Sequence, residues 1–336
     1  MPKFRLLSVF LSAAILLTAS PALAQDYSKL PEMTIKMAHM AVPASEDNPY
    51  QMMCEYMKKN LEEKTGGRLK VELFHSGQLG RDRELMEAIQ FGTLELAVIT
   101  TSPISNFVPA HTILDYPFLF ESWDHVENFL NSQANQDLMA ESQKARFHTL
   151  GIIPRGFRST TNNKVKIYKP SDMTAIKLRV IESPIYIDAF TALGVAAQGM
   201  SWGEVFTALQ QGTIDGHENA LSTIYDERVF EVQKYLSLTK HIFAFCAVVA
   251  SPPLFDKMPK EYQDLIRETT IEALPIIAAR QRLEEEGYLK RLADRGMEIN
   301  DIDSMEPFQE KMVKVWEKYN KNKVIKKYFD AIEALK

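Results

Sequence analysis

The densest cluster of polar side chains in the sequence is Asp215-Gly216-His217-Glu218-Asn219. Carboxylate and imidazole groups could bind a metal ion or transfer a proton there. No second cluster with a recognisable ligand spacing accompanies it, and the sequence has no His-Glu-x-x-His motif and no glycine-rich phosphate loop. We therefore expect no metal, no cofactor and no enzymatic activity, and we interpret the cluster as the polar end of a strand that faces a cleft. An enzyme that uses Asp215, His217 and Glu218 is the alternative.

The elements that would position this cluster are alternating strands and helices. Strands are expected where apolar and polar residues alternate, and helices where apolar residues recur every three to four positions. The first half predicts strands at Met33–His39, Lys70–Phe74 and Leu94–Ile99, a helix that follows Asn48 and ends at Gly66-Gly67, and a helix over Asp82–Phe91. This alternation is typical of a mostly parallel sheet covered by helices.

A short segment of the chain recurs 120 positions later. Glu84, Ala88, Gln90, Gly92 and Thr93 return as Glu204, Ala208, Gln210, Gly212 and Thr213. Two lobes of one architecture would produce this repeat, and their strand ends would meet at a shared cleft, where open α/β sheets bind ligands. The alternative explanation is that many helix-to-strand turns look alike. A shared cleft between two lobes is typical of a hinged binding protein.

The chain is longer than one hydrophobic core usually organises, which also predicts two lobes. We expect the first lobe to comprise residues 25–155 and about 245–284, and the second to comprise residues 156–244 and about 285–336. Beyond Pro252-Pro253 the composition predicts long, charged helices over Lys260–Arg295, with a kink at Pro275, and over Phe308–Leu335. We interpret these helices as scaffold.

The N-terminus predicts export from the cytoplasm. Lys3 and Arg5 precede an apolar run, Leu6–Leu17, and small residues follow it, as in a secretory signal peptide that is cleaved after about Ala24. The run is shorter than the roughly 20 residues needed to span a bilayer. Removal of residues 1–24 lowers the basic residues from 39 to 37 against 44 acidic ones, a net charge of −7. Such a balance predicts no nucleic-acid partner.

The second half carries three blocks that belong together. Residues 156–163 are Gly-Phe-Arg-Ser-Thr-Thr-Asn-Asn, residues 177–184 are Lys-Leu-Arg-Val-Ile-Glu-Ser-Pro, and residues 200–219 run from Met-Ser-Trp-Gly-Glu-Val-Phe to Ile-Asp-Gly-His-Glu-Asn. Upstream, Thr-Gly-Gly-Arg stands at 65–68 and Gly-Gln-Leu-Gly at 77–80. From about Met33 to the C-terminal helices, the chain resembles the DctP-type solute receptors of TRAP (tripartite ATP-independent periplasmic) transporters.

This resemblance implies two α/β lobes that close over an organic acid. In the family a buried strand arginine holds the ligand carboxylate, and the matching residue here is Arg179. A guanidinium group suits this role because it is planar, remains charged and can bind both carboxylate oxygens. The resemblance also implies ligand contacts for Arg158, Asn219 and Trp202. The structural alternatives are an ion pair between Arg179 and Glu182, loop hydrogen bonds for Arg158 and Asn219, and a core position for Trp202.

The sequence departs from the family pattern at several positions. His217 and Ala220 replace the glutamine and proline of the motif Asp-Gly-Gln-Glu-Asn-Pro. Where receptors for sialic acid have an asparagine the chain has Glu182, and Met40, Thr100 and Thr101 occupy other polar contact positions, which argues against sialic acid. We include Glu182, His39, Met40, Asp82 and Thr100 among the ligand-binding residues. A sugar acid, an amino acid, an aromatic acid and a dicarboxylate all remain possible ligands.

The resemblance further implies delivery of the ligand to an ion-driven permease in the inner membrane. A sensory receptor of the same fold, which signals to a membrane protein, is the alternative partner arrangement. The chain is expected to be a periplasmic monomer or homodimer. Its two cysteines, Cys54 and Cys246, are expected to be small buried residues, and the sequence does not indicate whether they pair.

Overall fold

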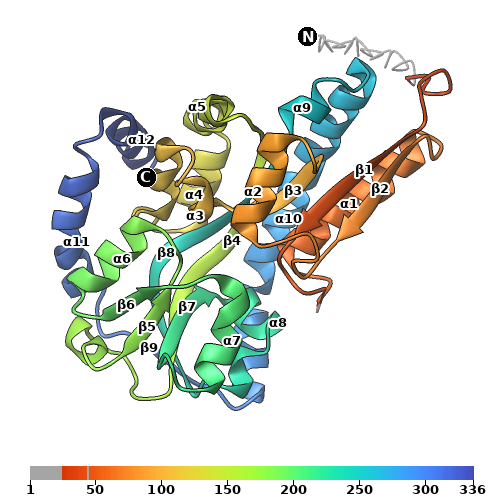
Figure 1. Cartoon of the computed structure of the whole chain (residues 1–336). Coiled ribbons are helices and arrows are strands. Elements are labelled where there is room, and N and C mark those ends of the chain that lie inside the picture. Colours follow the sequence, from red (N-terminus) through yellow and green to blue (C-terminus); the bar gives the residue numbers. More distant parts are fainter. Residues whose placement is uncertain (1–24, 44) are drawn as a thin grey trace, which may run out of the picture.

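The computed structural model describes residues 25–43 and 45–336 as a mixed α/β protein (Figure 1). One sheet of nine strands runs through the described chain, with helices packed around it. The predicted signal peptide, residues 1–24, lies outside the described residues. In the part of the chain that is described, no helix combines the length and the apolar character needed to cross a membrane.

The first half forms alternating strands and helices. Its elements are β1 (Met33–His39), α1 (Pro49–Lys64), β2 (Leu69–Phe74), α2 (Asp82–Phe91) and β3 (Leu96–Thr100). Strand β1 pairs in parallel with both β2 and β3. Helix α1 begins after Asn48 because the Asn48 side chain accepts hydrogen bonds from the backbone N–H groups of Tyr50 and Gln51. The five predicted elements are confirmed, with bounds that shift by at most two residues.

Short helices and two long strands follow. The segment 101–145 contains α3 (Thr101–Ile104), the 3₁₀ helix η1 (Pro109–Asp115), α4 (Trp123–Leu130), α5 (Gln133–Glu141) and η2 (Ser142–Ala145). The next elements are β4 (His148–Asn162), η3 (Pro170–Met173), β5 (Lys177–Val180), α6 (Pro184–Ala192), β6 (Ala196–Gly199), α7 (Trp202–Gln210), β7 (Gly216–Ala220), α8 (Leu221–Asp226), η4 (Val229–Glu231) and β8 (Tyr235–Ala250).

The long strands β4 and β8 join the two halves of the sheet. The strand order is β2-β1-β3-β8-β4-β7-β5-β6, and β9 (Glu298–Asp301) pairs with β8. Strand β3 pairs with residues 246–250 of β8, whereas β7 pairs with residues 158–162 of β4. Five of the eight strand pairings between described residues are parallel. The sheet is therefore mixed and mostly parallel, as the sequence predicts.

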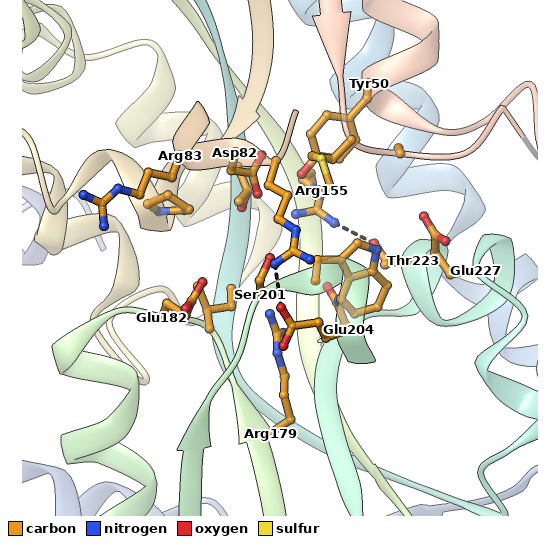
Figure 2. A pocket seen from close by; sticks show the side chains of 18 of the residues that line it. Tyr50, Asp82, Arg83, Arg155, Arg179, Glu182, Ser201, Glu204, Thr223 and Glu227 are labelled. Atoms are coloured by element: carbon orange, nitrogen blue, oxygen red, sulfur yellow. Dashed lines mark hydrogen bonds and ion pairs between the residues drawn. The ribbon is translucent and has the colours of Figure 1, made fainter. Parts of the chain in front are cut away.

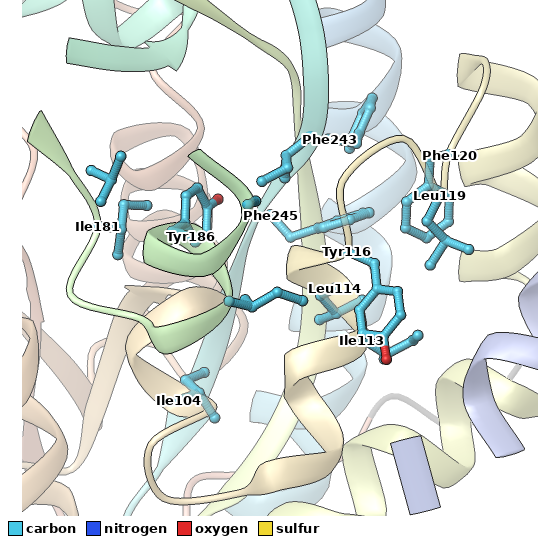
Figure 3. Packing of buried hydrophobic residues seen from close by; sticks show 14 of the residues in the cluster. Ile104, Ile113, Leu114, Tyr116, Leu119, Phe120, Ile181, Tyr186, Phe243 and Phe245 are labelled. Atoms are coloured by element: carbon cyan, nitrogen blue, oxygen red, sulfur yellow. The ribbon is translucent and has the colours of Figure 1, made fainter. Parts of the chain in front are cut away.

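A continuous apolar core connects both halves (Figure 3). Ile104 and Phe120, from the segment after β3, belong to the same buried cluster as Tyr186 of α6 and Phe245 of β8. The ring centroids of Phe120 and Phe245 lie 5.4 Å apart in an edge-to-face arrangement, which aromatic rings favour. Strand β8 thus fixes the relative position of the two halves through side-chain packing as well as through its hydrogen bonds.

The 120-residue repeat is a repeat of structure. Helix α2 and strand β3 flank Gly92, and helix α7 and strand β7 flank Gly212. Both glycines have left-handed backbone conformations, with φ of 77° and 69°, which end a helix at little cost only when no Cβ is present. Strand β3 pairs in parallel with β1, and β7 pairs in parallel with β5. The two copies place the N-terminal ends of α2 and α7 on opposite sides of one cavity.

The C-terminal part consists of α9 (Pro252–Phe255), α10 (Lys260–Asp294), β9, α11 (Glu306–Tyr319) and α12 (Lys323–Glu333). Helix α10 continues through the exposed Pro275. The single helix predicted over Phe308–Leu335 is wrong, because the chain leaves the helical conformation between Tyr319 and Lys323. Asn322 then caps α12 by accepting a hydrogen bond from the backbone N–H of Val324.

The division of the chain into two lobes stays a prediction. Helix α11 packs against α6, and the hydroxyl of Tyr319 donates to Asp188 of α6 at 2.7 Å. Helix α12 instead packs against α5 and η1, and the carbonyl of Ile332 hydrogen bonds to His125 at 2.9 Å. The two helices therefore contact both predicted lobes. Cys54 and Cys246 are both buried, and neither forms a disulfide.

Candidate functional site

A cavity of about 640 Å³ lies between the two copies of the repeat (Figure 2). The N-terminal ends of α2 and α7 border it, β3 and β7 contribute their C-terminal ends, and β4 and β5 supply arginines. A volume of this size is typical of sites for small molecules. Of the nine residues predicted to bind a ligand, the following line the cavity: Met40, Asp82, Thr100, Arg158, Arg179, Glu182, Trp202 and Asn219.

Arg179 extends from β5 into this cavity (Figure 2). The side chain is 3% exposed, and its Nε and Nη2 donate to the carbonyl oxygen of Met200 at 2.8 and 2.6 Å. Its guanidinium lies 5.5 Å from the ring centroid of Trp202. No ion pair joins Arg179 to an acid among the described residues, and the pairing with Glu182 considered from the sequence does not occur. Arg179 is therefore a buried cation without a formal counter-charge in direct contact.

The pKa of Arg179 reflects its burial without a paired acid. Burial lowers the pKa of Arg179 to about 10, the charge of Glu218 opposes this change, and the nearby charge of Arg158 adds to it. The group stays protonated at neutral pH in spite of the cost of desolvation. A ligand carboxylate would supply the missing negative charge. The Nη1 and Nη2 edge of the guanidinium is the side that could bind both carboxylate oxygens, because Nε is already engaged by Met200.

Arg158 differs from Arg179 because it has a full set of protein partners. Its Nε donates to Oε2 of Glu218 at 2.5 Å, and its Nη2 donates to Oε1 of the same carboxylate at 2.9 Å. Its Nη1 donates to Oδ1 of Asn219 at 3.0 Å. Both members of the ion pair are at most 1% exposed. This geometry makes Arg158 a positioning residue for Asn219, and its direct contact with a ligand stays a prediction.

Glu218 is held ionised by its neighbours. Burial alone would raise the pKa of Glu218, but the charge of Arg158 and the hydrogen bonds from His241 and Arg158 outweigh it and lower the pKa to about 2. His241 Nε2 lies 3.1 Å from Glu218 Oε2. The polar cluster singled out in the sequence is thus built into the protein interior, and Glu218 neutralises one of the two matched arginines.

Asn219 and Trp202 both line the cavity, and their contact with a ligand stays a prediction. Asn219 is 4% exposed, and its Oδ1 accepts hydrogen bonds from Arg158 and from the backbone N–H of Ala220 at 3.0 Å each. These bonds orient the amide so that its Nδ2 is the group left for a ligand. Trp202 is the first residue of α7, and its half-buried ring packs against both Arg179 and His217.

The remaining predicted residues differ in their surroundings. Glu182 is exposed at the cavity, and its backbone carbonyl accepts a hydrogen bond from Asn106 at 3.2 Å. Asp82 is the first residue of α2, and burial raises its pKa to about 6 against the opposing charges of Arg155 and Arg179. His39 is not among the residues that line the cavity. Its ring is buried, lies 3.1 Å from Gln51, and has a pKa lowered to about 4 by burial.

Arg155 also lines the cavity, although the sequence pattern did not lead us to predict it. Arg155 and Arg158 are three positions apart, so in a regular strand they would point to opposite faces. Strand β4 has an irregular register between Pro154 and Gly156, and such a bulge changes which face the following residues occupy. The Pro-Arg-Gly sequence at residues 154–156 was the available signal, because proline and glycine within a strand often mark a bulge.

A Gly-x-Ser-x-Gly pattern, which is a motif of some hydrolases, was also overlooked at residues 199–203. Its Ser201 lies at the cavity, between β6 and α7. The nucleophile of such enzymes occupies a strained turn and is activated by a histidine. Ser201 instead has an unstrained backbone (φ −60°, ψ 144°), and no hydrogen bond joins it to a histidine within residues 25–43 and 45–336. In the same described ranges, no group of three or more His, Cys, Asp or Glu residues is arranged to hold a metal ion.

The buried His217 leads to a prediction about acid stability. Its Nδ1 lies 2.7 Å from Thr161 Oγ1, and burial, with the charge of Arg179, lowers its pKa to about 3, against an ordinary value of about 6.5. Because the folded-state pKa is depressed, His217 stabilises the fold fully above about pH 6.5 and loses this contribution as the pH falls toward 3, by at most about 1.4 kcal/mol per pH unit.

We therefore expect His217→Gln to lose less stability than the parent between about pH 6.5 and 4.5. Urea unfolding at several pH values measures the difference. Glu218 is present in both proteins, and an unfolded glutamate is half protonated only at about pH 4.3, so a difference between the two proteins above about pH 5 reports on His217. If the free energy of unfolding fell equally with decreasing pH in both proteins, the assignment of this titration to His217 would be wrong.

Comparison with known proteins identifies the family of the chain. Residues 38–322 match the family model DctP, described as bacterial extracellular solute-binding protein, family 7. A solute-binding protein of Verminephrobacter eiseniae is 37% identical over 72% of each chain. A TRAP periplasmic solute-binding protein of Bordetella bronchispeptica, whose ligand density was interpreted as pantoate, is 32% identical, has a TM-score of 0.85, and matches 90% of this chain and 99% of its own.

A second solved structure supports the same assignment. It is a TRAP periplasmic solute-binding protein of Polaromonas bound to D-erythronate, which is 30% identical, has a TM-score of 0.86, and matches 91% of this chain and 99% of its own. Sequence and structure therefore agree over nearly the whole described chain, and the protein belongs to the DctP family, the solute-binding proteins of TRAP transporters.

Proposed function

We propose that this protein is the periplasmic receptor of a TRAP transporter and binds a small organic acid in the cavity between its lobes. Arg179 holds the ligand carboxylate, and Asn219 and Trp202 contact the body of the ligand. The loaded receptor delivers the acid to an ion-driven permease of the inner membrane. The ligands of the two similar structures, D-erythronate in one and density interpreted as pantoate in the other, support a hydroxylated carboxylate.

One observation carries this proposal more than any other. Arg179 is 3% exposed, faces the cavity, and has no acid in direct contact among the described residues. A buried charge without a partner costs free energy, so a protein retains one where a ligand of opposite charge compensates it. Of these two neighbouring arginines, Arg158 has its own buried carboxylate, whereas Arg179 has none in direct contact.

Closure of the lobes would couple binding to delivery. Contacts between the two sides are already present and include Arg81 Nη1 with Glu204 at 2.5 Å, Asn106 with the carbonyl of Glu182 at 3.2 Å, and Asn48 with Asp226 at 3.0 Å. The ion pair is about half exposed on both sides and contributes little on its own. A ligand that contacts both sides only when they are close would add the free energy that favours the closed state.

A sensory receptor of the same fold is the second candidate, because a membrane signalling protein could recognise the same closed state. Coupled transport distinguishes the two: the receptor and its permease, placed in vesicles with an ion gradient, would accumulate the acid, whereas a sensor would not support uptake. An enzyme is disfavoured because Ser201 has no described histidine partner. Turnover of a bound acid would reveal one.

Thermal unfolding of residues 25–336 in the presence of organic acids tests the binding function. The protein is first unfolded and refolded to remove acids carried over from expression. An acid at 100 times its dissociation constant stabilises the folded state by about 2.7 kcal/mol. We expect D-erythronate or D-galactonate to raise the unfolding temperature, and D-galactose, which lacks the carboxylate, to have no effect. Equal shifts with acid and sugar would contradict the carboxylate requirement.

A further inference from the structure

The far side of the cavity from Arg179 contains another buried guanidinium, in addition to that of Arg158. Arg155 is 6% exposed, and its Nη2 donates to Thr223 Oγ1 at 2.6 Å. Its guanidinium lies 4.8 Å from the ring centroid of Tyr50 on α1. The buried Nε has no hydrogen-bond partner among the described residues. In Figure 2, Arg155 and Tyr50 extend from one side of the cavity, and Arg179 extends from the other.

Two carboxylates accompany Arg155. Asp82 and Glu227 both line the cavity, and Arg155 lowers the pKa of each against the larger effect of burial, which raises it. Glu227 accepts a long hydrogen bond of 3.4 Å from the backbone N–H of Val42, and the Trp202 side chain also lowers its pKa by hydrogen bonding. The described residues donate no hydrogen bond to the Asp82 carboxylate. This end of the cavity therefore presents one strong donor group and two acceptor groups that are available to a ligand.

Such a mixture suits hydroxyl groups better than it suits a second charge. A hydroxyl donates one hydrogen bond and accepts others, so neighbouring hydroxyls can accept from Arg155 and donate to Asp82 or Glu227. A second carboxylate on the ligand would be repelled by these two acids, and their own oxygens would gain no donor. An ammonium group would be attracted by the two acids, but unlike a hydroxyl it cannot accept a hydrogen bond from Arg155. At the Arg179 end a ligand carboxylate meets no such repulsion, because the buried acid there, Glu218, is paired with Arg158.

We propose that Arg155, Asp82 and Glu227 form a polyol subsite, so that the ligand is a polyhydroxy monocarboxylate whose hydroxylated end binds there. This inference rests on the proposed function, because it takes the carboxylate to be held by Arg179. It selects sugar acids over dicarboxylates, and it makes Arg155 and Asp82 residues that determine specificity.

Titration calorimetry with acids of increasing length tests the subsite. The probes are D-glycerate, D-erythronate and D-galactonate, which carry the same carboxylate and an increasing number of hydroxyls, together with succinate. The parent should bind D-galactonate more tightly than D-glycerate, and succinate weakly. Arg155→Met should lower the affinity for D-galactonate roughly 10- to 100-fold, the usual loss for hydrogen bonds to a charged group, and change that for D-glycerate less than about threefold.

A second variant tests the same subsite by removing the negative charge of Asp82. Asp82→Asn keeps the size of the side chain and removes one of the two negative charges, so it should weaken D-galactonate binding and strengthen succinate binding. Arg282→Met is the matched control for Arg155→Met. Arg282 lies on α10, outside the residues that line the cavity, and pairs with Asp124 and Glu127 at 2.7 and 3.0 Å. It should leave all four affinities unchanged.

The outcomes separate the inference from the proposed function. If Arg155→Met weakened all probes equally, or if the parent bound succinate as tightly as D-galactonate, the polyol subsite would be wrong while the receptor function would stand. If no acid bound to the parent, the proposed function would fail and the inference would fail with it. If Arg155→Met did not fold, as judged by its thermal unfolding, Asp82→Asn would decide between these outcomes.

Discussion

Arg179→Met is expected to lose about 2–5 kcal/mol of binding free energy for the ligand acid, the usual loss when one partner of a buried charge pair is truncated. The parent guanidinium has no acid in direct contact among the described residues, so its removal leaves no protein carboxylate uncompensated. The free energy of unfolding without ligand should therefore change little, or should rise as the desolvated charge disappears. Calorimetry with D-galactonate and urea unfolding of the same protein measure both quantities.

The control for this experiment is Arg282→Met, which removes an arginine of α10 from an exposed pair and should bind the acid like the parent. Unchanged affinity in Arg179→Met would exclude the carboxylate clamp. A large loss of folding stability without ligand would show that Arg179 supports the fold through its two hydrogen bonds to Met200.

Arg158→Met is expected to lower mainly the free energy of unfolding, whereas Arg179→Met lowers mainly the ligand affinity. Its removal leaves Glu218 buried without its main counter-charge, and breaking a buried ion pair in this way typically costs about 3–5 kcal/mol of stability. Urea unfolding measures this loss. The double variant Arg158→Met/Glu218→Gln removes the stranded charge as well, so it should recover a large part of the lost stability.

The comparison of single and double variants decides the role of Arg158. Recovery in the double variant would assign the loss to the uncompensated carboxylate. If Arg158→Met were as stable as the parent and bound the acid much more weakly, Arg158 would be a direct ligand contact, as the resemblance implies, and its role as a positioning residue for Asn219 would be wrong.

Local sequence patterns predicted the elements from β1 to β3. The alternation over Met33–His39 and the apolar periodicity of α2 are properties of adjacent residues, so the sequence alone contains them. The repeat from Glu84 to Thr213 also revealed that two similar units face one cavity. The break between α11 and α12 was missed, because the apolar periodicity on both sides of Asn322 suggests one continuous helix.

The site was harder to predict, because its properties depend on contacts between distant residues. Arg158 and Arg179 look alike in the sequence, and only the pairing of β4 with β7 brings Glu218 to Arg158 and not to Arg179. Arg155 reaches the cavity because of an irregularity in β4, which an alternating pattern cannot represent. His39 has the residue type of a ligand contact, but the chain buries it beside Gln51, outside the cavity lining.

A crystal structure of residues 25–336 with D-galactonate tests the carboxylate clamp most directly. We expect both carboxylate oxygens within about 3 Å of Nη1 and Nη2 of Arg179, the usual distance for a bidentate pair, with Arg158 still bound to Glu218. A carboxylate bound elsewhere in the cavity, with Arg179 contacting only the carbonyl of Met200, would contradict the clamp.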